Sequence, residues 1–182
     1  MSKFDFTTFP VLTTPRLVLR KLTEQDTDAI QALRSNEQVN TYLNRKGPVS
    51  KQQALDFIHK VVSNTDKGES VYWCIELQDS PQLVGTICLW NFNHLKKMVD
   101  IGYELLLDFQ GKGLMQEAMQ AVLKYAFDVL KLETITALSH KDNAKSIHLL
   151  LKNHFLADQR QQYVSKTEAG GLAVYYLKRN TG

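Results

Sequence analysis

The stretch from Asp100 to Ala126, DIGYELLLDFQGKGLMQEAMQAVLKYA, combines a strand pattern, a glycine-rich turn and a helix pattern in immediate succession. The segment 101–107 is short and mostly apolar, which is typical of a buried strand. From Met115 onward the apolar residues recur at steps of three and four, which predicts an amphipathic helix. Gly111 and Gly113 lie between them, so the chain can turn sharply and present backbone N–H groups at the start of that helix.

This glycine turn is the first candidate binding site. Anions are stabilised at a helix N-terminus by the dipole and the unpaired N–H groups, and Lys112 adds a mobile positive charge, so we expect a phosphate there. Gln116 replaces the third glycine of the dinucleotide fingerprint, and no Ser or Thr follows Lys112 as in a P-loop. The alternative is a plain strand-to-helix connection whose glycines serve a steric purpose.

Three motifs share a family resemblance. Residues 110–118, Gln-Gly-Lys-Gly-Leu-Met-Gln-Glu-Ala, directly follow a strand that contains Ile-Gly-Tyr-Glu-Leu, and they resemble the acetyl-CoA pyrophosphate loop of the GNAT N-acetyltransferases. Residues 14–20, Thr-Pro-Arg-Leu-Val-Leu-Arg, and the Asn-Ala-Lys-Ser of residues 143–146 are similar to the RimJ/RimL-like branch of that superfamily. The resemblance covers about residues 13–178, nearly the whole chain.

The resemblance implies acetyl-CoA as co-substrate and a set of residues that bind it. The loop and helix start would hold the pyrophosphate, the end of the preceding strand would meet the pantetheine, and the Asn-x-x-Ser helix start would reach the pantetheine arm. In this sequence the implied cofactor-binding residues are Leu105, Leu106, Leu107, Gln110, Gly111, Lys112, Gly113, Leu114, Met115, Asn143 and Ser146.

The predicted fold is a single α+β (α/β) domain over residues 1–182, with an N-terminal arm at residues 1–12. The resemblance implies a mixed, mostly antiparallel sheet of about six to seven strands, helices on both faces, and splayed central strands that hold CoA. Apolar and β-branched runs predict strands at 15–22, 71–77, 83–92, 101–107 and 134–139, and closing strands at 162–165 and 174–177. Helix start signals occur at Thr23, Ser50 and Asn143.

Composition excludes several classes of protein. With 43% hydrophobic and 23% charged residues in 182, the chain is typical of a globular protein. No apolar run approaches the roughly 18 residues of a membrane span, and the N-terminus does not resemble a secretory signal, so we expect a cytoplasmic protein with no membrane partner. A net charge of +3 with scattered Lys and Arg argues against nucleic-acid binding. The oligomeric state stays open, with a homodimer as one option.

Glu104 is the candidate general base. It is the only acid in the segment 101–107, and an amine acceptor must lose a proton before it attacks the thioester. Burial in an apolar run would make the carboxylate a better proton acceptor, directly or through water. The alternative is a structural carboxylate paired to a helix cation such as Lys124. Backbone N–H groups around Leu105 to Leu107 would stabilise the developing oxyanion.

Ser146 is the candidate general acid for the departing thiolate. Many GNAT enzymes carry a Tyr seven residues after the helix-start Asn, but Leu150 occupies that position here, and the RimL-like branch implies the Ser of Asn-x-x-Ser instead. Ser146 is equally explained as ordinary polarity at a helix start. A thiolate is a tolerable leaving group, so the reaction does not require a strong acid.

The remaining candidates concern the acceptor and metals. Residues 40–49 carry turn formers and no acid, and by the resemblance they border an acceptor that is a protein N-terminus, as in ribosomal proteins, or a small amine. A non-catalytic CoA sensor is the rival class. Trp73, Trp90 and Phe92 are candidate pocket walls, although core packing is the preferred explanation of each. The histidines do not cluster, so no metal is expected. Cys74 and Cys88 could face each other across a hairpin, and we expect two buried thiols without chemistry.

Overall fold

The computed structural model describes residues 4–45, 47–160, 162–163 and 171–179. One sheet has the strand order β1-β2-β3-β4-β5-β6-β8-β7. Its strands are β1 (Leu12–Thr13), β2 (Leu17–Lys21), β3 (Ser70–Leu77), β4 (Leu83–Asn93), β5 (Met98–Leu105), β6 (Thr134–His140), β7 (Leu156–Ala157) and β8 (Leu172–Lys178). The helices are α1 (Thr27–Ser35), α2 (Glu37–Asn40), α3 (Lys51–Asp66), α4 (Leu114–Asp128) and α5 (Ala144–Lys152), with 3₁₀ turns η1 (Glu24–Asp26) and η2 (Leu107–Phe109).

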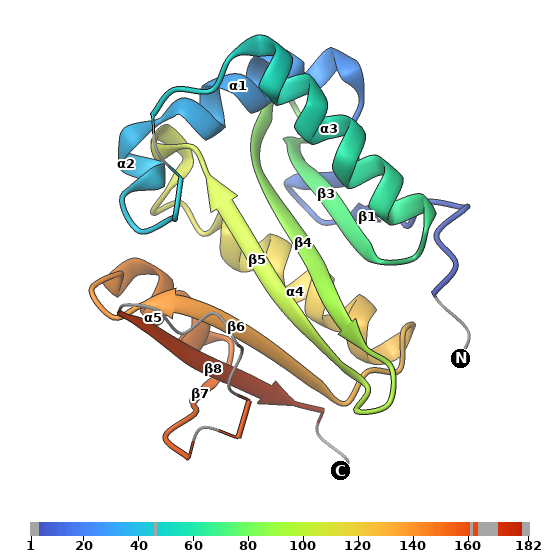
Figure 1. Ribbon diagram of the computed structural model, residues 1–182, viewed down its shortest axis with the longest axis vertical. Helices are drawn as coiled ribbons and strands as arrows, with labels where there is room; N and C mark the ends of the chain where they lie inside the picture. Colours follow the sequence, from blue (N-terminus) through green and yellow to red (C-terminus); the bar gives the residue numbers. More distant parts are fainter. Residues whose placement is uncertain (1–3, 46, 161, 164–170, 180–182) are drawn as a thin grey trace.

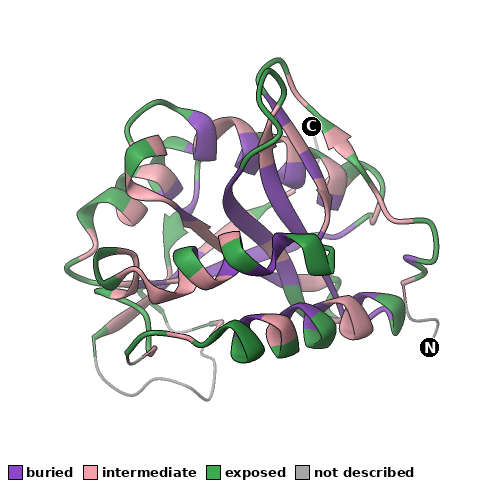
Figure 2. Ribbon diagram, turned by 90° about the horizontal axis from the view of Figure 1, so that it is seen from above, coloured by how far each residue is buried: buried purple, intermediate pink, exposed green. Residues whose placement is uncertain are grey.

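Helices cover both faces of the sheet. Figure 1 shows α1, α2 and α3 on one face and α4 and α5 on the other. Ile30 of α1 and Ile58 of α3 are buried in a small core on the first face, and Met119 of α4 is buried in the larger core. In Figure 2 the sheet is buried between these layers, and the outer sides of the helices are exposed. Burial of one apolar stripe from each helix thus holds the layers together.

The predicted fold class is confirmed. All strand pairs are antiparallel except β5 with β6, which are parallel and joined by the crossover helix α4. The sheet has eight strands rather than six to seven, because the two-residue strands β1 and β7 extend its edges. The N-cap signals at Ser50 and Asn143 are confirmed, since each side chain accepts a hydrogen bond from the backbone N–H three residues later.

The bounds of one predicted strand were wrong, and another predicted strand is a turn where it is described. β5 begins earlier, at Met98, and ends at Leu105 rather than at residue 107. The chain turns after Leu105 because Leu107 begins η2, with the N–H of Phe109 donating to the carbonyl of Leu106. The predicted closing strand 174–177 lies within β8, but residues 162–163 form a turn, and residues 164–165 lie outside the described residues. β7 pairs with β8 instead.

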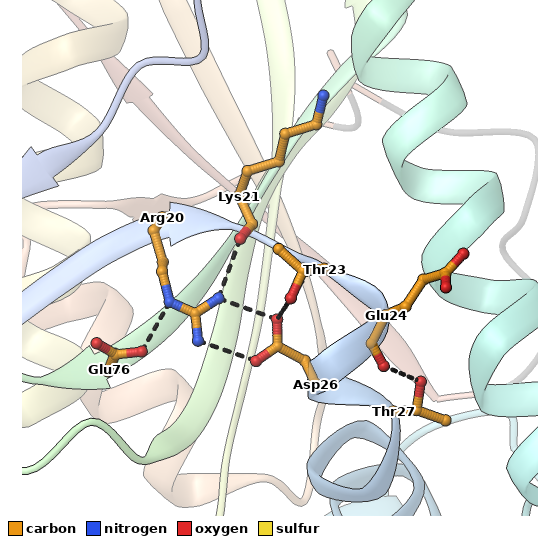
Figure 3. Close-up of polar contacts among 7 residues, drawn as sticks. All are labelled: Arg20, Lys21, Thr23, Glu24, Asp26, Thr27 and Glu76. Atoms are coloured by element: carbon orange, nitrogen blue, oxygen red, sulfur yellow. Dashed lines mark hydrogen bonds and ion pairs between the residues drawn. The ribbon is translucent and has the colours of Figure 1, made fainter.

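A network around Arg20 fixes the end of β2 to the start of α1 (Figure 3). The Arg20 guanidinium makes two 2.9 Å contacts with the carboxylate of Asp26 and one 2.7 Å contact with Glu76. The N–H of Thr23 donates to the same Asp26 carboxylate at 2.8 Å. Burial opposes the charge of Asp26, but the hydrogen bonds from Arg20 and Thr23 outweigh it and hold the pKa of this carboxyl below its usual range.

The low pKa of Asp26 couples stability to acid pH. The unfolded carboxyl takes up its proton before the native one, so the stabilisation is complete above the usual value of 3.8 and is lost as pH falls through the lower native pKa. We expect Asp26→Asn to lower the free energy of unfolding at neutral pH by about 3 kcal/mol, measured by urea unfolding. We expect the variant to show a shallower loss of stability in acid.

The matched control is Asp66→Asn, which removes the exposed 2.8 Å ion pair with Lys21. This change should cost about 0.5 kcal/mol or less, because exposed ion pairs are screened by solvent. If both variants lost the same free energy of unfolding and the same dependence on acid pH, the acid sensitivity could not be assigned to Asp26.

Candidate active site

The site is built where β5 and β6 separate. These strands pair from Met98 with Thr134 to Ile101 with Ala137, and then both continue, β5 along β4 and β6 along β8. Within the described part of the chain, no strand pairs with the outer edge of β5 beyond Ile101. The predicted splay of the central strands is therefore confirmed, and it leaves backbone groups of β5 facing an opening.

The direction of these backbone groups follows from the pairing of β5 with β4. The N–H of Leu106 donates to the carbonyl of Val84 at 2.9 Å, so it is already engaged. Because backbone groups alternate along a strand, the N–H groups of Tyr103 and Leu105 point the other way, toward the opening. The N–H groups of Tyr103 and Leu105 are thus available to a ligand in the opening, whereas that of Leu106 is not. Leu107 lies beyond the strand, in η2.

The glycine turn has the predicted geometry of an anion site. Gly111 and Gly113 adopt positive φ angles of 74° and 76°, which glycine adopts without steric cost. Gly113 is the N-cap of α4 and supplies no capping side chain, and the first helical hydrogen bond runs from the N–H of Glu117 to the Gly113 carbonyl at 3.1 Å. The N–H groups of Leu114 and Met115 come before that bond and have no acceptor within the helix, so they can donate hydrogen bonds to a phosphate.

An ion-pair cluster holds this turn against the start of β2. The Glu117 carboxylate accepts from the Thr14 hydroxyl at 2.6 Å and from the Arg16 Nε at 2.6 Å, and Arg16 also donates to the Lys112 carbonyl at 2.9 Å. Burial favours the neutral acid, but these hydrogen bonds hold the pKa of Glu117 below its usual range. The sequence showed Thr14 and Arg16 as part of a motif, but not their contact with α4.

Gln110 links the glycine turn to the end of β5 and to the start of α5. Its Nε2 donates to the Leu105 carbonyl at 2.9 Å, and its Oε1 accepts from the Lys145 ammonium at 3.1 Å. Lys145 lies in the first turn of α5, beside Asn143 and Ser146. The structure therefore brings together, around the opening, the three segments that the sequence assigned to acetyl-CoA.

Glu104 lies beside the cavity and is ion-paired, as in the alternative to the base role, but its partner is Arg45 and not Lys124. The Arg45 guanidinium contacts both oxygens of Glu104, at 2.9 and 3.0 Å, and donates to the Asn40 side chain at 2.8 Å. Lys124 instead contacts Asp128 at 2.7 Å. Glu104 is thus paired to the loop 40–49 rather than to α4. A base role requires the carboxylate lone pairs that Arg45 does not occupy.

A cavity of about 240 Å³ opens beside Glu104 on the face covered by α1 and α3. Pairing places Tyr72, Cys88 and Gly102 in one row of the sheet and Thr86 and Glu104 in the next, so these residues form its floor. Its walls come from α1, α3 and the loop: Arg34, Leu43, Arg45 and Phe57. Tyr103 also contributes to the lining. The cavity is a candidate acceptor site because it adjoins the open edge of β5.

The three candidate pocket walls lie outside the cavity lining, and the two cysteines do not face each other directly. Trp73 is fully buried in the core and Phe92 packs against Phe4, while Trp90 is 44% exposed, and none of the three predicted walls is among the residues lining the cavity. Cys88 pairs with Tyr72 in the sheet, so the two cysteines are diagonal neighbours rather than opposite. Both are free, and burial raises the pKa of each thiol to about 12. Cys88 nevertheless lines the cavity.

Ser146 is held on the other face of the sheet. Its backbone N–H donates to the Asn143 side chain at 3.1 Å, and its hydroxyl lies 2.8 Å from the Tyr103 hydroxyl. Burial raises the pKa of Tyr103 to about 12, although the hydrogen bond with Ser146 partly opposes the shift. Tyr103 is therefore a neutral phenol that spans the opening between β5 and α5. A role for Tyr103 in the site is not evident from the sequence, because aromatic residues in a strand usually serve packing.

The described residues provide neither a metal site nor a membrane-spanning helix. They contain no cluster of three or more His, Cys, Asp or Glu side chains that could hold a metal ion. None of the described helices is long and apolar enough to cross a membrane.

Comparison with known proteins identifies the fold and the chemistry. The chain is 35% identical over 147 residues to the uncharacterized N-acetyltransferase YoaA of Bacillus subtilis, covering 81% of this chain and 83% of that protein. It is 25% identical over 137 residues to the spermidine N(1)-acetyltransferase of Escherichia coli, covering 75% and 71%. The structure of RimL, a ribosomal L7/L12 alpha-N-protein acetyltransferase, in complex with coenzyme A superposes with a TM-score of 0.79 at 19% identity, covering 93% and 98%.

The family model for the acetyltransferase (GNAT) domain matches residues 16–156, which include the splayed strands, the glycine turn and the Asn-x-x-Ser helix start. Acetyl-CoA as co-substrate and acyl transfer as the reaction, both implied by the sequence motifs, are confirmed by this family match. The chain belongs to the GNAT acetyltransferase family.

Proposed function

We propose that the protein transfers the acetyl group of acetyl-CoA directly to a primary amine, and that this amine is the N-terminal α-amine of a protein such as a ribosomal protein. The observation that carries the proposal is the position of Glu104. It faces the cavity from β5, the strand whose open edge presents the N–H groups of Tyr103 and Leu105. An amine in the cavity would meet a base and a held thioester together.

The assigned roles divide between the faces of the sheet. The amides of Gly111 to Met115 would bind the pyrophosphate, and Asn143 would contact the pantetheine arm. Tyr103 and Leu105 would donate backbone N–H groups to the thioester oxygen, where negative charge develops. Glu104 would accept the proton of the amine, directly or through water. Ser146 would give a proton to the departing thiolate.

The acceptor assignment is supported by the charge of the cavity. A polyamine carries several positive charges, and a site for it would present several carboxylates. Among the described lining residues Glu104 is the one carboxylate, and Arg45 neutralises it. The RimL structure shows that this fold can acetylate a protein N-terminus. The second candidate, a small amine, is favoured by the similarity to spermidine acetyltransferase.

Acetyl-CoA consumption by the purified protein would test the acceptor. The panel would contain peptides with different first residues, together with polyamines, aminoglycosides and amino acids, and calorimetric CoA binding would serve as the control. We expect peptide-dependent turnover. Turnover of a polyamine alone would replace the proposed acceptor, and CoA binding without turnover of any amine would favour a sensor.

The hydroxyl pair of Tyr103 and Ser146 gives a separate prediction. Tyr103→Phe keeps the ring but removes one hydrogen bond, so we expect kcat to fall about fivefold, which corresponds to roughly 1 kcal/mol. Ser146→Ala removes the proposed proton donor as well as this contact, so kcat should fall at least as far, and the double variant should be no worse than Ser146→Ala alone. Steady-state kinetics would measure this, with Tyr125→Phe as the control. Losses that multiply in the double variant would show independent roles.

A further inference from the structure

Arg34 is a cation of the cavity that the proposed chemistry does not use. It lies in the last turn of α1, and its guanidinium carbon is 3.8 Å from the centre of the Phe57 ring. Within the described part of the chain the guanidinium makes no hydrogen bond or ion pair, and its Nε is buried without a partner. A cation in this setting is destabilised unless an anion compensates it.

The cavity itself does not supply that anion. Its one described carboxylate, Glu104, is held on both oxygens by Arg45. The described lining therefore carries two positive charges and one negative charge. Burial and the nearby charge of Arg45 both lower the pKa of Arg34, and the charge of Glu104 opposes them only in part. One more negative group in the cavity would balance these charges.

Acetyl-CoA would not provide this group either. The glycine turn that is expected to bind its pyrophosphate begins α4, on the face opposite α1 and α3 (Figure 1). Arg34 lies on the acceptor side, among Leu43, Phe57 and Tyr72. The missing negative charge therefore belongs to the acceptor.

We propose that the acceptor carries a carboxylate close to its reactive amine, and that Arg34 binds this carboxylate while the amine faces Glu104. The inference deepens the proposed function and rests on the acceptor role of the cavity. A volume of about 240 Å³ requires the two groups to be close in one molecule. The planar guanidinium, with Phe57 against one face, is suited to a planar carboxylate.

Two sources of such a carboxylate fit this chemistry. One is an acidic side chain next to the first residue of a protein, and the other is the α-carboxylate of a free amino acid. The first agrees with a protein N-terminus as acceptor, and the second would make the protein a small-molecule enzyme. The same arginine disfavours polyamines, because these acceptors bring further positive charge.

Calorimetry with matched acceptor pairs separates these cases. The protein is saturated with CoA, which has no acetyl group to transfer, and is titrated with Ser-Asp-Ala-amide against Ser-Asn-Ala-amide, and with serine against serinamide. We expect the carboxylate member of one pair to bind about 10- to 100-fold more tightly, as is usual for charge-assisted hydrogen bonds. The pair that shows the preference identifies the source of the carboxylate.

Variants assign the preference to Arg34. Arg34→Met keeps an apolar stem against Phe57 and should bring the affinity ratio to about one, whereas Arg34→Lys keeps the charge and should retain part of the preference. Arg160→Met, at an exposed position away from the cavity, should leave the ratio unchanged. CoA affinity should be the same in all these proteins.

The preference of the unaltered protein decides the outcome even if a variant folds poorly. Equal affinities within both pairs, tighter binding of the neutral members, or no measurable binding of any member would overturn the inference. Acetyl transfer from acetyl-CoA is measured separately. Transfer to peptides without a preference for acid would keep the proposed function and reject the role of Arg34. Tighter binding of the carboxylate member without acetyl transfer to peptides would keep the role of Arg34 and reject the proposed transfer to a protein N-terminus.

Discussion

Gly111→Val is expected to weaken CoA binding about 100-fold or more. Gly111 has a φ of 74°, which a β-branched residue rarely adopts, so the turn must rearrange. A Cβ at this position meets no protein atom within 4 Å, so the new side chain would also enter the open space where the phosphate is expected. Loss of two charge-assisted hydrogen bonds to the pyrophosphate, each about 1.5 kcal/mol, accounts for the magnitude.

The chain offers a matched control for this change. Gly47 has nearly the same φ, 72°, and a Cβ there also meets no atom within 4 Å, but it lies in the loop on the acceptor side. Gly47→Val should therefore carry a similar backbone strain and leave the calorimetric affinity for CoA unchanged. Normal CoA affinity in Gly111→Val, with the fold intact by circular dichroism, would contradict the assignment of the glycine turn.

Glu104→Gln is expected to lower kcat/KM at neutral pH by about 100- to 10,000-fold, the usual range for loss of a general base. Gln cannot accept the proton of the amine, so more of the acceptor must arrive already neutral. The deficit should therefore shrink as pH rises toward the pKa of the acceptor. Steady-state kinetics across pH would measure this, and CoA affinity should stay normal because the glycine turn lies elsewhere.

The ion pair with Arg45 provides the test that separates a base from a structural carboxylate. If Glu104 only held the loop 40–49, Arg45→Gln would cause the same loss as Glu104→Gln, and the double variant would be no worse. If Glu104 is the base, we expect Arg45→Gln to retain much of the kcat/KM of the unaltered protein and the same dependence of kcat/KM on pH. Unchanged kinetics in Glu104→Gln at every pH would remove this residue from the mechanism.

The sequence by itself determined the fold class and the glycine turn at the start of α4. Both depend on local patterns: the alternation of strands, the steps of three and four in α4, and two glycines one residue apart. Such patterns act through backbone conformation and helix geometry, which neighbouring residues control. Hence the parallel pairing of β5 with β6, the positive φ angles of Gly111 and Gly113, and the cap at Asn143 all agree with the prediction.

The acceptor side was decided by tertiary structure. Arg34, Arg45 and Phe57 come from α1, a loop and α3, and no spacing in the sequence relates them to Glu104. The same holds for Tyr103 with Ser146, which are 43 residues apart. The end of β5 at Leu105 was also not evident from the sequence, because the apolar run continues into η2. Contacts of this kind arise when layers pack against one another, so only the folded chain shows which charges meet in the cavity.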